Sequence, residues 1–114
     1  MNVIKERDKA RKILNVMVEY FVLNNFQSIN ASIDIDKKST KVFIEGIINP
    51  NHLKLEELRN ELKIPRVLAY DDYYDVLMDS DSEEELKVIG YLVDESDIKL
   101  DGNVLTVKLI RNHI

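Results

Sequence analysis

Cysteine is absent from this chain of 114 residues, and glycine, proline and histidine are scarce. Without cysteine, disulfides, thiol catalysis and thiolate metal sites are all excluded. The three glycines lie far apart, so the chain lacks the glycine-rich loop whose main-chain N–H groups hold phosphate in many proteins. The only histidines, His52 and His113, keep no metal-ligand spacing. We therefore expect no cofactor and none of these common catalytic sites.

Long hydrophobic runs are also missing. No apolar stretch approaches the roughly 20 residues that a membrane-spanning helix needs. Residues 1–12 are charged throughout and lack the apolar core of a secretory signal. We therefore expect a single cytoplasmic domain over residues 1–114, without membrane contact and long enough to bury a core.

The net charge of -5 is divided unevenly along the chain. Residues 1–66 carry 12 Lys and Arg against 9 Asp and Glu, whereas residues 67–114 carry 4 against 12. The acidic half would repel a phosphate backbone, so we expect no nucleic-acid binding. The division favours an oppositely charged protein partner or two copies associated head to tail; the alternative is that solubility charges fell unevenly.

The first element expected is a helix over residues 5–24. Apolar residues follow its period at Ala10, Ile13, Leu14, Met17, Val18 and Phe21. From Ile13 onward this helix is apolar almost all round, which is typical of a helix packed on a sheet. The pair Asn24–Asn25 is a suitable stop, because asparagine tolerates the left-handed conformation there.

An alternating hairpin is expected next. Residues 28–36 place Ile29, Ala31, Ile33 and Ile35 on one face and polar side chains on the other. The returning strand, 41–49, buries Val42, Ile44 and Ile48. Its opposite face carries Phe43 and Ile47, so we expect this strand to be covered on both sides or to lie beside a helix.

The middle of the chain is expected to be mainly helical. Asn49–Pro50 breaks the strand, and leucines at helical spacing predict a helix over 53–62 that ends at Ile64–Pro65. Residues 66–81 suit either a short strand or a helical turn, and we favour a short helix over 71–78.

The last third begins with a capping box, Ser82 with Glu85, which opens a further helix. Gly90 in that helix would allow close packing. Asp101–Gly102 then predicts a tight turn between two final strands. The order α-β-β-α-(α)-α-β-β predicts an α+β two-layer sandwich, with an antiparallel or mixed sheet covered by helices on one face.

Two surface features are candidates for function. Tyr70, Asp71, Asp72, Tyr73 and Tyr74 join aromatic anchors to carboxylates, which would suit a basic protein partner; the alternative is that the tyrosines cap the edge of the sheet. The acidic run 71–85 could collect Mg²⁺ or Ca²⁺ through oxygen ligands, but it lacks the glycine and the final glutamate of a calcium loop. A solvated acidic loop is the favoured interpretation of the run.

The closing segment Leu86-Lys87-Val88-Ile89-Gly90-Tyr91-Leu92-Val93-Asp94-Glu95, followed by a hairpin, resembles the end of the histidine-kinase-like ATPases. Their anti-sigma-factor serine kinase branch is the most similar. The first helix and the strands after it also resemble the opening of that fold. The resemblance implies a shared fold and an ancestral ATP site.

This sequence departs from that family at the motifs that bind ATP. The family places Glu and Asn four apart on the first helix, but Glu19 is followed at that spacing by Leu23, and Asn24 comes one residue late. One residue turns a side chain about 100° around a helix. Glu45 replaces the Asp of the next motif, and residues 78–85 carry five carboxylates where the family has a phosphate loop.

The function expected is therefore a non-catalytic regulatory or protein-interaction module that does not bind ATP. Its partner would be another protein, or a second copy in a homodimer. The alternative is a small enzyme of the histidine-kinase-like ATPase type that binds a nucleotide or a divalent metal.

Overall fold

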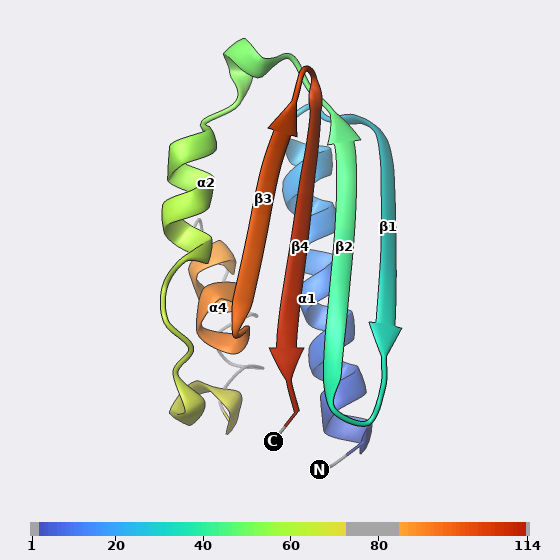
Figure 1. Cartoon of the computed structure of the whole chain (residues 1–114), viewed down its shortest axis with the longest axis vertical. Helices are drawn as coiled ribbons and strands as arrows, with labels where there is room; N and C mark the ends of the chain where they lie inside the picture. The colour runs from blue at the N-terminus through green and yellow to red at the C-terminus, as the bar shows by residue number, and fades with distance from the viewer. Residues whose placement is uncertain (1–2, 73–84, 114) are drawn as a thin grey trace.

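Four antiparallel strands form one sheet, with the helices Val3–Leu23 and Glu85–Leu92 behind one of its faces and the helix Leu55–Leu62 beside one of its edges (Figure 1). The computed structural model describes residues 3–72 and 85–113. The elements are α1 (Val3–Leu23), β1 (Gln27–Ile35), β2 (Ser39–Ile47), α2 (Leu55–Leu62), α4 (Glu85–Leu92), β3 (Glu95–Asp101) and β4 (Val104–Asn112), with 3-10 helices at Pro50–His52 and Leu68–Asp72. This confirms the α+β sandwich, and the strand order is β1-β2-β4-β3.

Helix α1 packs on the sheet as its pattern predicts. Ile13, Met17 and Phe21 are fully buried. The helix stops where expected, because Asn25 adopts a φ of 65° and the N–H of Phe26 donates to the carbonyl of Phe21 at 3.1 Å. Gly46 on β2 leaves room for this packing, since a Cβ there would lie 3.1 Å from the rings of both Phe21 and Phe26.

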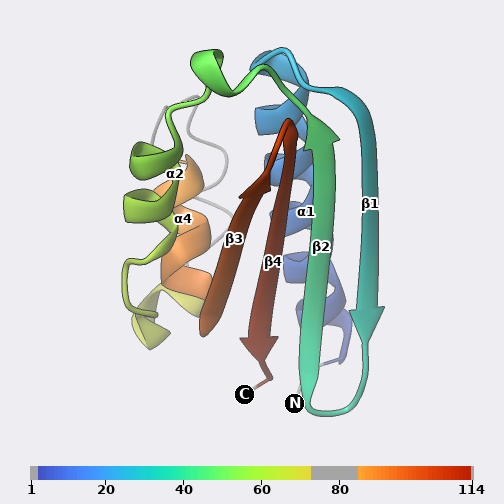
Figure 2. The same ribbon diagram turned by 45° about the horizontal axis from the view of Figure 1, so that its top comes forward.

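The two faces of the sheet differ. Strand β2 directs Val42 and Ile44 toward the helices, where both are buried, whereas Phe43 and Ile47 on the other face are half-buried. No element among the described residues covers that other face (Figure 2). Within the described part of the chain, β2 is therefore covered on one side only, and the prediction holds in its other form because α1 lies along the inner face of β2.

Helices α2 and α4 pack against each other beside β3 (Figure 2). Gly90 makes this contact close, because a Cβ there would lie 2.8 Å from the carbonyl oxygen of Glu61. The final hairpin also forms, but its turn residues are Gly102 and Asn103, one position later than predicted. Gly102 has a φ of 61°, a conformation that glycine adopts without strain.

Part of the middle segment is described. The chain forms a 3-10 helix over Leu68–Asp72, at the start of the short helix predicted for 71–78. Residues 73–78 of that predicted helix, with Tyr73 and Tyr74, lie outside the described residues, as does the capping serine Ser82. Helices long and apolar enough to cross a membrane are absent from the described part of the chain.

Candidate functional site

Arg111 forms a buried ion-pair cluster at the end of the molecule where the chain termini lie (Figure 1). Its side chain is 1% exposed. The guanidinium donates to Glu6 at 2.9 and 3.1 Å and to Asp71 at 2.9 and 3.2 Å. It also donates to the carbonyl oxygen of Leu92 at 2.8 Å. One arginine therefore joins α1, β4, the 3-10 helix and the end of α4.

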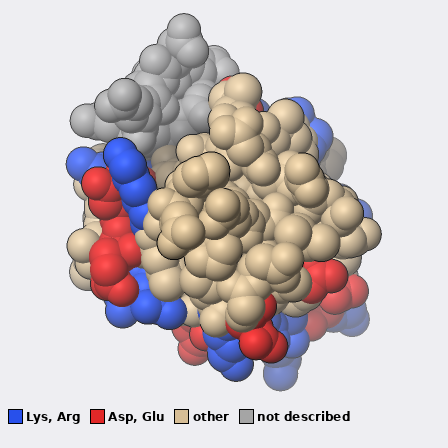
Figure 3. Space-filling model, turned by 90° about the horizontal axis from the view of Figure 1, so that it is seen from above, with Lys and Arg blue, Asp and Glu red and all other residues tan. Residues whose placement is uncertain are grey.

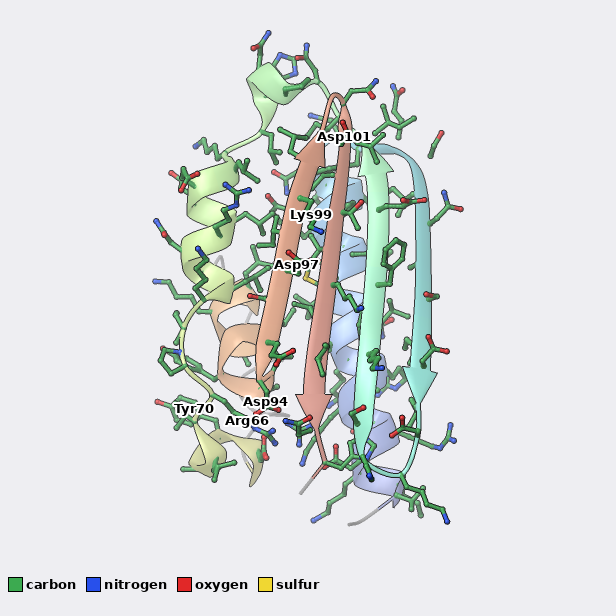
Figure 4. All side chains as sticks on the ribbon, in the orientation of Figure 1. Arg66, Tyr70, Asp94, Asp97, Lys99 and Asp101 are labelled. Atoms are coloured by element: carbon green, nitrogen blue, oxygen red, sulfur yellow. The ribbon has the colours of Figure 1, made fainter. Side chains whose placement is uncertain are left out.

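Arg66 extends this cluster toward β3 (Figure 4). It pairs with Asp71 at 3.1 Å and with Asp94, and it donates to the carbonyl of Asn112 at 2.8 Å. Asp94 in turn accepts the main-chain N–H of Asn112 at 2.6 Å. We call Glu6, Arg66, Asp71, Asp94 and Arg111 the charge cluster.

Two arginines and the buried Lys9, whose ammonium lies 3.8 Å from Glu6, face the three carboxylates of the charge cluster. Burial disfavours the ionised form of Glu6, but hydrogen bonds and charge attraction from Arg111 outweigh it, so the pKa of Glu6 lies below its ordinary value. Burial is likewise outweighed at Asp71, whose pKa is lowered by Arg111 and then by Arg66. These carboxylates are held ionised by arginines, which is the chemistry of a structural clamp rather than of an acid–base catalyst.

The cluster changes how the predicted interaction residues must be interpreted. Asp71 is 4% exposed and faces inward, so it is not a surface carboxylate available to a basic partner. Tyr70 is half-buried, and its ring packs edge-on against Tyr91 with centroids 4.8 Å apart. Asp72 ends the same 3-10 helix. The interaction role of the tyrosines stays a prediction.

The sequence pattern around Arg111 could have predicted that this arginine is buried. The alternation of β4 places Arg111 on the same face as three buried residues, Leu105, Val107 and Leu109. An arginine directed into a core needs carboxylate partners there. The partners themselves lie 105 and 40 positions away, so local pattern could not identify them.

A second candidate site is a groove of about 640 Å³ between α1 and α2. Glu19, Tyr20 and Leu23 line it from α1, and Glu57 and Glu61 line it from α2. Leu23 is 71% exposed. We call this feature the acidic groove, because its three carboxylates face one lysine, Lys54, among the lining side chains.

The carboxylates of the acidic groove affect the pKa of Tyr20, which lines it. Burial raises the pKa of Tyr20, and the carboxylates of Glu61 and Glu57 raise it further. The adjacent end of the molecule, seen from above, presents a broad uncharged area with charged groups around it (Figure 3). Polar uncharged side chains line a hollow there, among them Asn25, Gln27, Asn49 and Asn103.

The acidic groove gathers only part of the positions compared above with ATP-binding motifs, because Glu45 does not line it. Glu19 and Leu23 of α1, Asn24 just after that helix, and Ile48 after β2 do line it. These lie far apart in the sequence and share one groove. No group of three acidic or histidine side chains able to hold a metal ion occurs among residues 3–72 and 85–113; most of the acidic run weighed as a metal site lies outside the described residues.

Comparison with known proteins identifies no relative of this chain: no family model, curated protein or solved structure matches it. The resemblance to the histidine-kinase-like ATPases therefore rests on the order and pattern of the elements alone. The function has to be argued from the surfaces of the molecule.

Proposed function

We propose that this chain is a non-catalytic protein-interaction module, a degenerate relative of the histidine-kinase-like ATPases that does not bind ATP. The observation that carries the proposal is the lining of the acidic groove. At the positions compared with the family's first motif, Glu19 presents a carboxylate beside apolar Leu23, and Glu57 and Leu53 line the opposite wall. The groove has no glycine and one lysine among its lining residues.

A triphosphate is a poor ligand for such a groove. Two like charges 4 Å apart repel by about 4 kcal/mol at the effective dielectric of a protein surface. Phosphate sites offset this repulsion with main-chain N–H groups at close range, usually at glycine, or with several cations. Lys54 would be a single cation against Glu19 and Glu57.

A basic amphipathic segment of a partner protein suits the groove better. Carboxylates on its walls would attract lysine and arginine, and the exposed Leu23 would contact apolar side chains along one face of a helix.

The alternative is a nucleotide- or metal-binding enzyme of the same ancestry. It is favoured by the convergence of α1, the end of β2 and the start of α4 on one groove. Binding stabilises the folded state by mass action, by about 2.7 kcal/mol at a ligand concentration 100 times the Kd. Thermal unfolding with and without ATP and Mg²⁺ therefore separates the two functions. We expect no shift, whereas a rise of several degrees would establish the alternative.

Partner binding can be tested with a synthetic probe. The probe is a short amphipathic peptide with leucines at helical spacing and lysines elsewhere, and its control replaces the lysines by glutamates. Amide chemical shifts of the labelled protein should move around Leu23 and Leu53 with the basic peptide only. The Glu57→Lys variant should weaken binding, whereas Glu56→Lys, next in the chain but outside the groove, should leave it almost unchanged. Equal weakening by both variants would contradict a role for the groove.

A further inference from the structure

The two edges of the sheet are protected to very different degrees. On the β3 edge, Arg59 of α2 donates to the carbonyl of Ile98 at 3.4 Å, and the hydroxyl of Ser96 donates to the carbonyl of Leu62 at 3.2 Å. Asp97 and Lys99 add charged side chains along that strand (Figure 4). Helix α2 runs beside β3 in both ribbon views (Figures 1 and 2). Such features prevent a further strand from pairing.

The β1 edge has little of this protection. A bulge between Gln27 and Asn30 disrupts the first residues of β1. There Ser28 has a φ of 52°, and its carbonyl oxygen accepts a hydrogen bond from the side-chain amide of Asn30 at 3.1 Å. From Asn30 to Ile35 the pairing with β2 is regular. This stretch contains no proline or lysine, and Asp34 is its one charged residue.

The direction of the main-chain groups on β1 follows from its pairing with β2. The N–H of Asp36 donates to the carbonyl of Ser39 at 3.0 Å, which fixes the alternation of the antiparallel ladder. Even-numbered residues of β1 therefore bond to β2. The N–H and C=O groups of Ala31, Ile33 and Ile35 point away from the sheet.

The side chains beside this edge are apolar on the helix side. Ile29, Ile33 and Ile35 are only half-buried, and Ala31 is exposed. A hollow lined by Val3, Arg7 and Ile35, among others, shows that this flank of α1 adjoins β1. Farther along the same helical flank, Leu14 and Val18 are half-buried and Val22 is 57% exposed. From Leu14 onward this flank of α1 is apolar, whereas its first turns carry the exposed Arg7 and Arg11.

We propose that β1 pairs with β1 of a second copy of this chain, antiparallel and centred on Ser32. This inference rests on the proposed function, because it names one partner of an interaction module. Ala31 would then oppose Ile33 of the second copy, and the outward main-chain groups of these two residues would form about four hydrogen bonds across the axis. The flanks of the two α1 helices would face each other on one side of the continuous sheet.

The side-chain pairs favour this register over one centred on Asp34. With Ser32 opposite itself, apolar residues face apolar residues on the helix side, and Asn30 lies opposite Asp34 of the second copy on the other side. An amide can donate a hydrogen bond to that carboxylate. Moving the centre to Asp34 would place two carboxylates directly opposite each other, which is unfavourable. The segment is therefore complementary to itself.

The first test is the molar mass of the full chain in solution, measured by light scattering and sedimentation over a range of concentrations. We expect a dimer of twice 13.3 kDa at high concentration. Ala31→Pro removes an outward N–H that β2 does not use, and edge strands tolerate proline at such positions. This variant should be monomeric with an unchanged far-UV circular dichroism spectrum. A native chain that stays monomeric, or an Ala31→Pro variant that folds and still dimerises, would overturn the proposal.

The second test uses a pair of variants with opposite expected signs. Asn30→Lys places a cation opposite Asp34 of the second copy, whereas Asn30→Asp places a second carboxylate there. Both variants lose the same hydrogen bond from the Asn30 side-chain amide to the carbonyl oxygen of Ser28. The dimer Kd should fall about 3- to 10-fold for the lysine variant and rise by a similar factor for the aspartate variant. A change in the same direction for both would overturn the register.

Failure of the dimer inference can be distinguished from failure of the proposed function. If the native chain is monomeric but binds the basic amphipathic peptide in the acidic groove, only the dimer inference fails. If the chain is stabilised by ATP and Mg²⁺ and also dimerises through β1, the non-catalytic function fails and the edge pairing stands.

Discussion

The charge cluster and the acidic groove occupy opposite ends of the molecule and use carboxylates in opposite ways. In the charge cluster, Glu6 and Asp71 are almost fully buried, and each pairs with arginine. In the acidic groove, Glu19 and Glu57 line a concave surface that carries one lysine. The first arrangement pairs its charges within the chain, and the second leaves them along a concave surface, where we propose that a partner binds. Charge on this chain is therefore informative about function only after burial is known.

The largest expected effect comes from breaking the charge cluster. Arg111→Ala leaves Glu6 and Asp71 buried without their shared cation, which should lower the free energy of unfolding by about 3–5 kcal/mol in urea titrations. Arg11→Ala is the control, because its pair with Asp8 is exposed and should contribute less than about 1 kcal/mol. Equal losses for the two variants would show that the buried pairs are not special.

Acid should weaken the same end of the molecule. The pKa values of Glu6 and Asp71 are lowered in the folded state, so their stabilisation is present above the pKa values of the unfolded chain and is lost as pH falls through the folded values. The melting temperature should begin to fall below about pH 4. The double variant Glu6→Gln with Asp71→Asn should be less stable at pH 7 and should show a flatter pH profile; an unchanged profile would contradict this assignment.

The wall of the acidic groove depends on how closely α2 and α4 approach. Gly90→Ala places a methyl group 2.8 Å from the backbone oxygen of Glu61, which cannot move without shifting α2. Unfolding experiments should show a loss of about 1–3 kcal/mol from overpacking. If Gly90→Ala were as stable as the native chain, the contact between the two helices would be looser than described.

The smallest effect on stability is expected in the acidic groove. Glu57→Lys changes an exposed side chain and should alter the free energy of unfolding by no more than about 0.5 kcal/mol. Its effect should instead appear in binding of the basic amphipathic peptide. A loss of stability as large as that of Arg111→Ala would remove the contrast between the two ends.

Periodic segments were predictable because each pattern reports a local geometry. The alternation at Ile29–Ile35 and the helical stripe through Ile13 and Phe21 identify their elements without reference to the rest of the chain. The strand order could not be predicted in this way, because pairing of β2 with β4 joins Ser39 to Asn112 across most of the sequence. Asp71 was placed on the surface for the same reason: its partner Arg111 lies 40 positions away.

The acidic groove was only partly predictable. The first helix does not carry a Glu and an Asn four residues apart, since Leu23 follows Glu19 at that spacing, and both residues line the groove. The opposing wall from Glu57 was not foreseen, because the position of α2 relative to α1 depends on packing and not on the pattern of either helix.

The position of β4 between β2 and β3 has a consequence for how the chain folds. Each hairpin has a short connection and can form early, but the central pairing must wait until residues 104–112 have been synthesised. The bond between Glu6 and Arg111 then closes a separation of 105 positions. Contacts between distant positions slow folding, because the entropy of closing a long loop is lost before the contacts contribute favourable free energy. Until β4 docks, β2 offers a second open edge, and this interval is when the chain is most prone to aggregate.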